Sequence, residues 1–206
     1  MATVVPVNTM LTWQADDGYG LEGVRLLLNS SGFRALGRMV RVGADGGFTA
    51  SYRLILGEDG TLQRVSLTSA TAQRERHLTL NRTEDGFWLV DTGSGGSRTS
   101  FDGAVDVDLA YSAMFNTLPI RRLGLHRGHG DHALKMVFVT LPELQVQLAE
   151  QHYRTVSTLD DDGSAVVAFS WGEFSANLVV DADAMVTTYP GVATQLPAHG
   201  VTSAAG

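Results

Sequence analysis

Short segments in which apolar and polar residues alternate follow one another along most of this chain, and they constrain its fold more than any other feature. Examples are VRLLLN (24–29), TASYRLIL (49–56), LQRVSLTS (62–69) and AVVAFSW (165–171). Between such segments stand groups rich in Asp and Gly, namely GEDG (57–60), TEDG (83–86) and DDDG (160–163). A period of two indicates β-strands, and Asp and Gly supply the backbone angles that turns require. The pattern therefore predicts a mainly β protein with little helix, as an antiparallel sheet or barrel.

A chain of 206 residues fits one β domain, and we find no composition shift that would mark a boundary. We expect a single domain over residues 1–192 and a flexible tail over residues 193–206. The segment at 141–153 starts like a helix, but Leu144, Val146 and Leu148 alternate, so we expect a strand there. Residues 94–100, SGGSRTS, are expected to form a flexible loop.

The charge balance excludes several classes of partner. The net charge is −7, and no run of Lys and Arg offers the clustered positive charge that a nucleic acid or an anionic membrane surface would need. The chain has no cysteine, which excludes disulfides and thiolate chemistry. Neither a signal-peptide pattern nor an apolar run of about 20 residues is present, so we expect a cytoplasmic protein without stable membrane insertion. No phosphate-loop motif occurs, and we expect no cofactor.

The stretch NTLPIRRLGLHRGHGDH (116–132) holds the most distinctive polar residues. We interpret residues 118–126 as a strand that runs into a turn. Neighbouring side chains of a strand point to opposite faces, so Arg121 and Arg122 would diverge, with Arg121 on the face of Leu123 and Leu125. A guanidinium drawn inside with leucines requires a carboxylate or an anionic ligand. Both interpretations, a structural ion pair and a ligand contact, remain open at this point.

Asp106 and Asp108, in DGAVDVDLAY (102–111), share one face of a predicted strand. Residues two apart in a strand are separated by about 6.5–7 Å, a distance also found between the catalytic carboxylates of glycoside hydrolases. Any D-x-D in a strand gives this spacing, and a solvated face or a partner for Arg121 or Arg122 explains it equally well.

Three histidines, His126, His129 and His132, recur at every third residue of the same stretch. Gly128 and Gly130 between them favour a hairpin tip over the helix that would align the rings. The spacing matches no zinc signature, so we predict a polar turn and no metal site.

Several of these motifs together resemble the putative glycolipid-binding family, a bacterial domain of unknown function. The resemblance rests on FDGAVDVDL (101–109), on NTLPIRRLGL (116–125), on Gln151 and Tyr153, and on VVDADAMVTTYPG (179–191). Trp13, Gly20, Glu22 and Tyr52 fit its N-terminal pattern, so the resemblance spans roughly residues 10–192. The chain departs from the family at residues 112–115, where a Thr-Pro pair is common, and at Ala184, where a glycine is usual.

The resemblance implies an open antiparallel β-barrel, or half-barrel, similar to the outer-membrane lipoprotein carriers that hold acyl chains. A curved sheet of this kind could enclose an apolar ligand on its concave face. The first hypothesis is therefore a non-enzymatic binding module for a small amphipathic ligand, a lipid or glycolipid. The sequence does not indicate an oligomeric state.

Under this hypothesis the polar head contacts a set of residues taken from the motifs. The set is Arg121, Arg122, Asp106, Asp108, Asn116, Gln151, Tyr153, Glu22 and Tyr52. The alternative hypothesis is a hydrolase of a glycosylated or acylated small molecule, with Asp106 and Asp108 as general acid and base. It requires that at least one of these carboxylates is not neutralised by an arginine.

Overall fold

The alternating segments form the strands of one large sheet. The computed structural model describes residues 7–29, 32–44 and 46–197, and within these residues fifteen strands pair in one continuous order from β8 to β9. The strands are β1 Val7–Ala15, β2 Gly20–Asn29, β3 Gly32–Gly43, β4 Gly46–Leu56, β5 Leu62–Thr71, β6 Glu75–Arg82, β7 Trp88–Asp91, β8 Gly96–Thr99, β9 Asp106–Leu109, β10 Asp131–Val139, β11 Val146–Ser157, β12 Ser164–Trp171, β13 Phe174–Asp181, β14 Val186–Tyr189 and β15 Ala193–Gln195.

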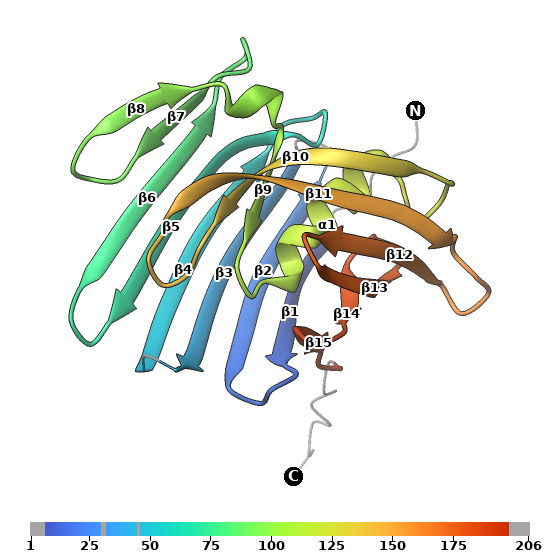
Figure 1. The fold of residues 1–206 in the computed structure, drawn as a ribbon. Coiled ribbons are helices and arrows are strands. Elements are labelled where there is room, and N and C mark those ends of the chain that lie inside the picture. The colour runs from blue at the N-terminus through green and yellow to red at the C-terminus, as the bar shows by residue number, and fades with distance from the viewer. Residues whose placement is uncertain (1–6, 30–31, 45, 198–206) are drawn as a thin grey trace.

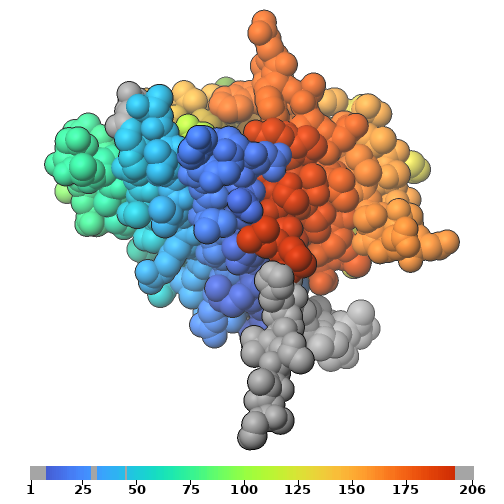
Figure 2. Space-filling model, turned by 90° about the horizontal axis from the view of Figure 1, so that it is seen from below, coloured from blue at the N-terminus to red at the C-terminus, as the bar shows by residue number. Residues whose placement is uncertain are grey.

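The sheet is a meander whose two halves meet where β1 pairs with β15. Figure 2 shows this junction, with the blue N-terminal strands beside the red C-terminal strands. All pairs are antiparallel except β9 and β10, which run parallel. The order ends at β8 and β9, which do not pair with each other, so the curved sheet stays open (Figure 1). The predicted mainly β, open half-barrel architecture is thereby confirmed.

Helix α1, Ala113–Leu123, lies between the two halves of the sheet (Figure 1). Every residue from Ala113 to Ile120 is buried. Gly124 ends the helix with a left-handed backbone (φ 67°), and the N–H of Leu125 donates to the carbonyl of Ile120 over 3.0 Å. This arrangement is a frequent helix C-cap, and glycine adopts it without a steric penalty.

The predicted strand over residues 118–126 is therefore wrong. A helix that is buried all round has no polar face, so its sequence lacks the 3.6-residue period by which an amphipathic helix is identified. Pro119 inside the helix adds to the misleading signal, because proline is disfavoured in helix interiors. Packing between two sheet halves overrides these local preferences.

Other expectations need smaller corrections. Gly96–Thr99, within the predicted loop, form edge strand β8. The strand expected over 141–153 begins only at Val146, after a turn, because Leu144 has a left-handed backbone (φ 55°). The histidine turn connects α1 to β10 and is not a hairpin tip. The tail begins later than residue 193, since Ala193–Gln195 pair with β1; residues 198–206 of that expected tail lie outside the described residues.

The turn signals of the sequence agree with the backbone. Gly60, Gly86 and Gly163, the last residues of the three Asp-Gly groups, all have positive φ angles, between 75° and 83°. Ala184 also has a positive φ, of 66°. This is the region that favours glycine, and Ala184 stands where the resembling family usually has one.

Candidate functional site

A chain of hydrogen-bonded side chains, here named the polar chain, links α1 to strands β11 and β9. Asn116 donates from Nδ2 to the hydroxyl of Tyr153 (2.9 Å), which donates to Oε1 of Gln151 (3.0 Å). Gln151 donates from Nε2 to Oδ2 of Asp108 (2.6 Å). All four side chains are buried. Gln151 and Tyr153 are two apart in β11, so they project from the same face of the sheet.

Asp108, at one end of the polar chain, is held in an environment that favours its neutral form. Burial raises the pKa of Asp108 to about 6, while the hydrogen bonds from Gln151 and from the N–H of Leu109 oppose this effect. Burial also raises the pKa of Tyr153 well above its ordinary value. Asp108 can therefore exchange a proton, or accept a hydrogen bond from a ligand, near pH 6.

A cavity of about 570 Å³, here named the aromatic pocket, lies beside the polar chain. Five aromatic side chains from β10, β12, β13 and β14 contribute to its wall: Phe138, Phe169, Trp171, Phe174 and Tyr189. The rings contact one another, with centroid separations of 4.5 Å for Phe138 and Trp171 and 5.8 Å for Phe169 and Tyr189. Asp108, Ser112 and Asn116 also line the cavity. An apolar enclosure with a few converging polar groups is the usual form of a small-molecule site.

A second polar cluster attaches the start of α1 to the N-terminal half of the sheet. Oε1 of Glu22 on β2 accepts hydrogen bonds from the hydroxyls of Tyr52 (2.8 Å) and Ser112 (2.6 Å). Burial raises the pKa of Glu22 to about 7, and hydrogen bonds from Ser112, Tyr52 and the first backbone N–H groups of α1 oppose this effect. The Tyr52 ring packs against Phe115 of α1, with centroids 5.0 Å apart.

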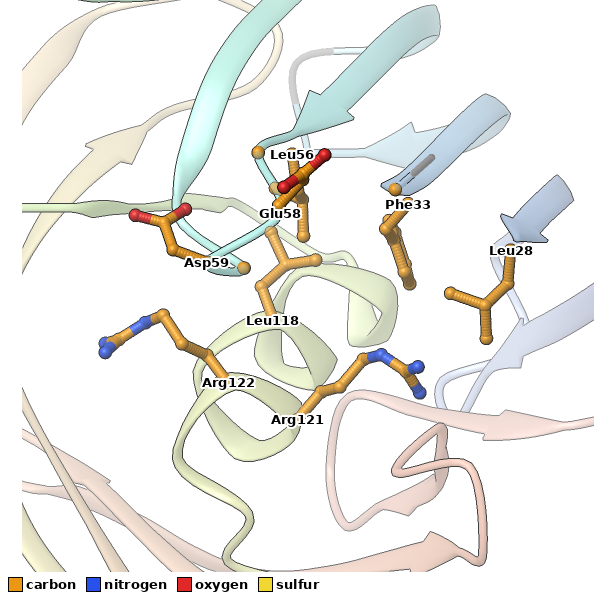
Figure 3. A pocket seen from close by; sticks show the side chains of 11 residues that line it. Leu28, Phe33, Leu56, Glu58, Asp59, Leu118, Arg121 and Arg122 are labelled. Carbon is orange, nitrogen blue, oxygen red and sulfur yellow. The ribbon is translucent and has the colours of Figure 1, made fainter. Parts of the chain in front are cut away.

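The two arginines of the central motif lie on a different cavity, of about 430 Å³, which we name the Arg121 pocket. Figure 3 shows their side chains leaving α1 in opposite directions, with Leu118 between them. Arg122 forms a two-point ion pair with Asp106, from Nε to Oδ1 (3.1 Å) and from Nη2 to Oδ2 (2.5 Å). Arg121 donates from Nη1 to the backbone carbonyl of Asp183 (2.8 Å). The two guanidinium groups diverge because successive helix residues are about 100° apart, and not because of strand alternation.

The carboxylates that the hydrolase hypothesis pairs have separate partners. Asp106 is neutralised by Arg122, whereas Asp108 accepts from Gln151 and faces the aromatic pocket. Burial raises the pKa of Asp106, and the ion pair with Arg122 opposes this rise. The hydrolase hypothesis requires a carboxylate that no arginine neutralises, and of the two only Asp108 meets this condition. Asp106 is therefore not free to act with it as the second catalytic carboxylate.

The predicted residues thus fall into four groups in space. Asp108, Asn116, Gln151 and Tyr153 form the polar chain, Glu22 and Tyr52 form a second cluster, Asp106 and Arg122 form an ion pair, and Arg121 lies apart. The motifs did not identify Ser112 or the aromatic side chains that line the aromatic pocket as site residues. Alternation in β12 could have placed Phe169 and Trp171 on one face, but it could not have brought β10, β13 and β14 beside them.

Hydrogen bonds from Thr155, a residue outside the histidine motif, hold the histidine turn in place. The single O–H of Thr155 lies within hydrogen-bond distance of two carbonyl oxygens, those of Leu125 and Gly128 (each 2.9 Å), and its oxygen accepts from the N–H of Gly130 (3.2 Å). His126 is buried, His129 is exposed, and His132 is in β10.

Within the described residues, no helix has the length and apolar character needed to cross a membrane. No curated protein matches the sequence. Among solved structures, the chain is similar to a DUF1089 family protein from Pseudomonas aeruginosa, known from a crystal structure at 1.80 Å resolution. The two are 25% identical, with a TM-score of 0.71, over 95% of this chain and 97% of the other.

The sequence model of one family, described as "Putative glycolipid-binding", matches residues 10–195. This range contains the polar chain, the aromatic pocket and both arginines. The chain therefore belongs to the putative glycolipid-binding family.

Proposed function

We propose that this protein binds a lipid or glycolipid, with the apolar chain of the ligand in the aromatic pocket and its polar head against Asp108 and Asn116. The observation that carries the proposal is the joining of an aromatic cavity of about 570 Å³ to a buried polar chain. Volumes of about 300–1,000 Å³ are typical of ligand sites. The family description supports the same ligand class.

The energetics favour an amphipathic ligand over a wholly polar one. Each methylene that leaves water for the aromatic pocket contributes about 0.8 kcal/mol. The head gains less net energy, because its hydrogen bonds to protein replace hydrogen bonds to water. Hydroxyl groups of a sugar can donate to Asp108 and accept from Asn116, so the polar chain would fix the orientation of the ligand while the apolar part supplies most of the affinity.

Eight of the nine residues taken from the motifs would then have a role at this site, whereas Arg121 lines the separate Arg121 pocket. Asp108 and Asn116 would contact the ligand, while Gln151 and Tyr153 would hold those two side chains in place. Glu22, Tyr52, Asp106 and Arg122 would fix α1, which forms part of the wall. The role is one of binding, without a covalent step.

The test measures binding of dodecyl β-maltoside, a single-chain glycolipid analogue, below its micelle concentration by isothermal titration calorimetry. Native mass spectrometry of the purified protein would show whether a lipid is retained. Val192 lines the aromatic pocket, and Val192→Phe is expected to fill it and weaken binding at least tenfold. The matched control is Val156→Phe, at an exposed position of β11. Equal binding by both variants, or no binding by the natural protein, would contradict the proposal.

A further inference from the structure

A third cavity continues from the aromatic pocket toward the turn between β5 and β6. This cavity, here named the Arg76 pocket, has a volume of about 700 Å³. It shares Tyr111, Leu141 and Glu143 with the aromatic pocket. Because the two cavities have these residues in common, a single ligand can extend from one into the other.

The Arg76 pocket differs from the aromatic pocket in its charge. Arg74 and Arg76 both line it, and Gln73 adds a neutral polar side chain. Among the residues that the structure describes, the acidic side chain on its wall is that of Glu143, which is exposed at the shared boundary. The neighbouring Glu75 is directed to His77, with 3.0 Å between Oε1 and Nε2. The side chains named here therefore give this cavity an excess of positive charge.

One nitrogen of Arg76 is left without a partner. Its Nη1 atom is buried and donates to no hydrogen-bond acceptor within the part of the chain that the structure describes. A buried guanidinium N–H without an acceptor is costly, and carboxylates and phosphates are the groups that satisfy it best. The cost would be recovered if the guanidinium of Arg76, which lines the cavity, turned Nη1 toward an anionic group of a ligand.

Tyr111 stands where the two cavities meet, and its backbone is strained. Its φ is 68°, in a region that non-glycine residues rarely adopt, and its side chain is 46% exposed. Phe48 contacts the ring, with centroids 6.2 Å apart, and the guanidinium of Arg41 lies 4.4 Å from the ring centroid. Strained residues of this kind concentrate at ligand contacts, where the surrounding structure maintains them.

We propose that the Arg76 pocket binds an anionic group, a phosphate or a carboxylate, of the same amphipathic ligand whose apolar chain occupies the aromatic pocket. This inference rests on the proposed function and deepens it by giving the head an anionic charge. Arg74 and Arg76 would contact the anion, and Tyr111 would lie beside the segment that joins it to the apolar chain.

The experiment compares three ligands with the same twelve-carbon chain: dodecyl phosphate, dodecanoate and dodecyl β-maltoside. The natural protein is expected to bind at least one of the two anions at least tenfold more tightly than the maltoside. The order of the two anions distinguishes a phosphate head from a carboxylate head. Added sodium chloride should weaken binding of the anion and leave binding of the maltoside unchanged, because salt screens exposed charges.

The double variant Arg74→Gln/Arg76→Gln is expected to lose the preference for the anion over dodecyl β-maltoside. Its affinity for the maltoside should stay within twofold of that of the natural protein. Arg38→Gln/Arg53→Gln removes the same charge from exposed positions of β3 and β4 and should change nothing. Arg76→Lys keeps the charge and should retain most of the preference. Far-ultraviolet circular dichroism checks the fold of each variant.

The outcomes separate the two proposals. Maltoside binding that is sensitive to Val192→Phe, together with no preference for either anion or an unaltered preference in the double variant, overturns the anion site and leaves the proposed function standing. Failure of all three ligands to bind overturns both.

Discussion

Ser112 donates a hydrogen bond of 2.6 Å to Glu22, a residue 90 positions earlier in the chain. The bond joins the residue that precedes α1 to β2, and the hydroxyl of Tyr52 donates to the same carboxylate oxygen over 2.8 Å. At the other side of α1, Asn116 is bonded to Tyr153 of β11. The helix is therefore attached to both halves of the sheet by buried polar contacts, and the wall of the aromatic pocket depends on them.

The ionisation of Glu22 should make stability depend on pH. Burial raises its pKa from 4.5 to about 7, so the folded state binds this proton more tightly than the unfolded state does. The contribution of the Glu22 carboxyl to the free energy of unfolding is complete below about pH 4.5 and is lost as the pH rises to about 7. Relative to that of the natural protein, the free energy of unfolding of the Glu22→Gln variant should rise by up to ~1.4 kcal/mol per pH unit in that window. Urea denaturation between pH 5 and pH 8 measures the difference. Glu173→Gln, at an exposed position, is the control, and a constant offset for Glu22→Gln would contradict the prediction.

Gly37 should tolerate no side chain. A Cβ at this position would lie 2.0 Å from Cζ of Tyr52, its neighbour across β3 and β4. The Gly37→Ala variant must move the Tyr52 ring away from Glu22, and we expect a loss of about 1–3 kcal/mol, as for other overpacked cores. Thermal denaturation followed by circular dichroism checks this. Gly23→Ala on β2 is the comparison, because a Cβ there meets no atom within 4 Å. Equal effects of the two substitutions would refute the steric explanation.

Arg122 and Arg121 should differ in their contribution to stability. Arg122→Gln leaves Asp106, 2% exposed, without its cation, and breaking a buried ion pair on one side costs about 3–5 kcal/mol. Arg121→Gln removes a hydrogen bond to the carbonyl of Asp183, worth about 1 kcal/mol. The free energy of unfolding of the two variants, measured at pH 7, tests this order. A larger loss for Arg121→Gln would show that the ion pair has been assigned too much weight.

The Tyr153→Phe substitution should interrupt the polar chain while keeping the aromatic ring of residue 153. The substitution removes the hydroxyl that joins Asn116 to Gln151 and leaves two buried amide groups each short of a partner. We expect a loss of about 1–3 kcal/mol in stability. Because Asn116 lines the aromatic pocket, dodecyl β-maltoside should also bind less tightly. Calorimetric titration measures the second effect, and Tyr19→Phe, at a position 65% exposed, serves as the control. Unchanged binding would separate the polar chain from ligand recognition.

The local part of this structure could be predicted from the sequence. The strands follow the two-residue alternation because each sheet face meets a different environment, and the Asp-Gly groups form turns because glycine accepts positive φ angles there. The motifs that contain Asp106, Asp108, Asn116 and Arg122 mark residues that do lie in or near α1, although the distances between them do not follow from the motifs.

Only the tertiary structure decided what those residues contact. α1 forms because the two sheet halves bury its residues from Ala113 to Ile120, and this environment depends on strands that are far away in the chain. The helix turns Arg122 to Asp106 and Arg121 to Asp183, where a strand would have set them on opposite faces. The aromatic pocket likewise combines residues of β9, β10, β12, β13 and β14. Alternation fixes which side of its own strand a residue faces, but the packing of distant strands determines what it meets there.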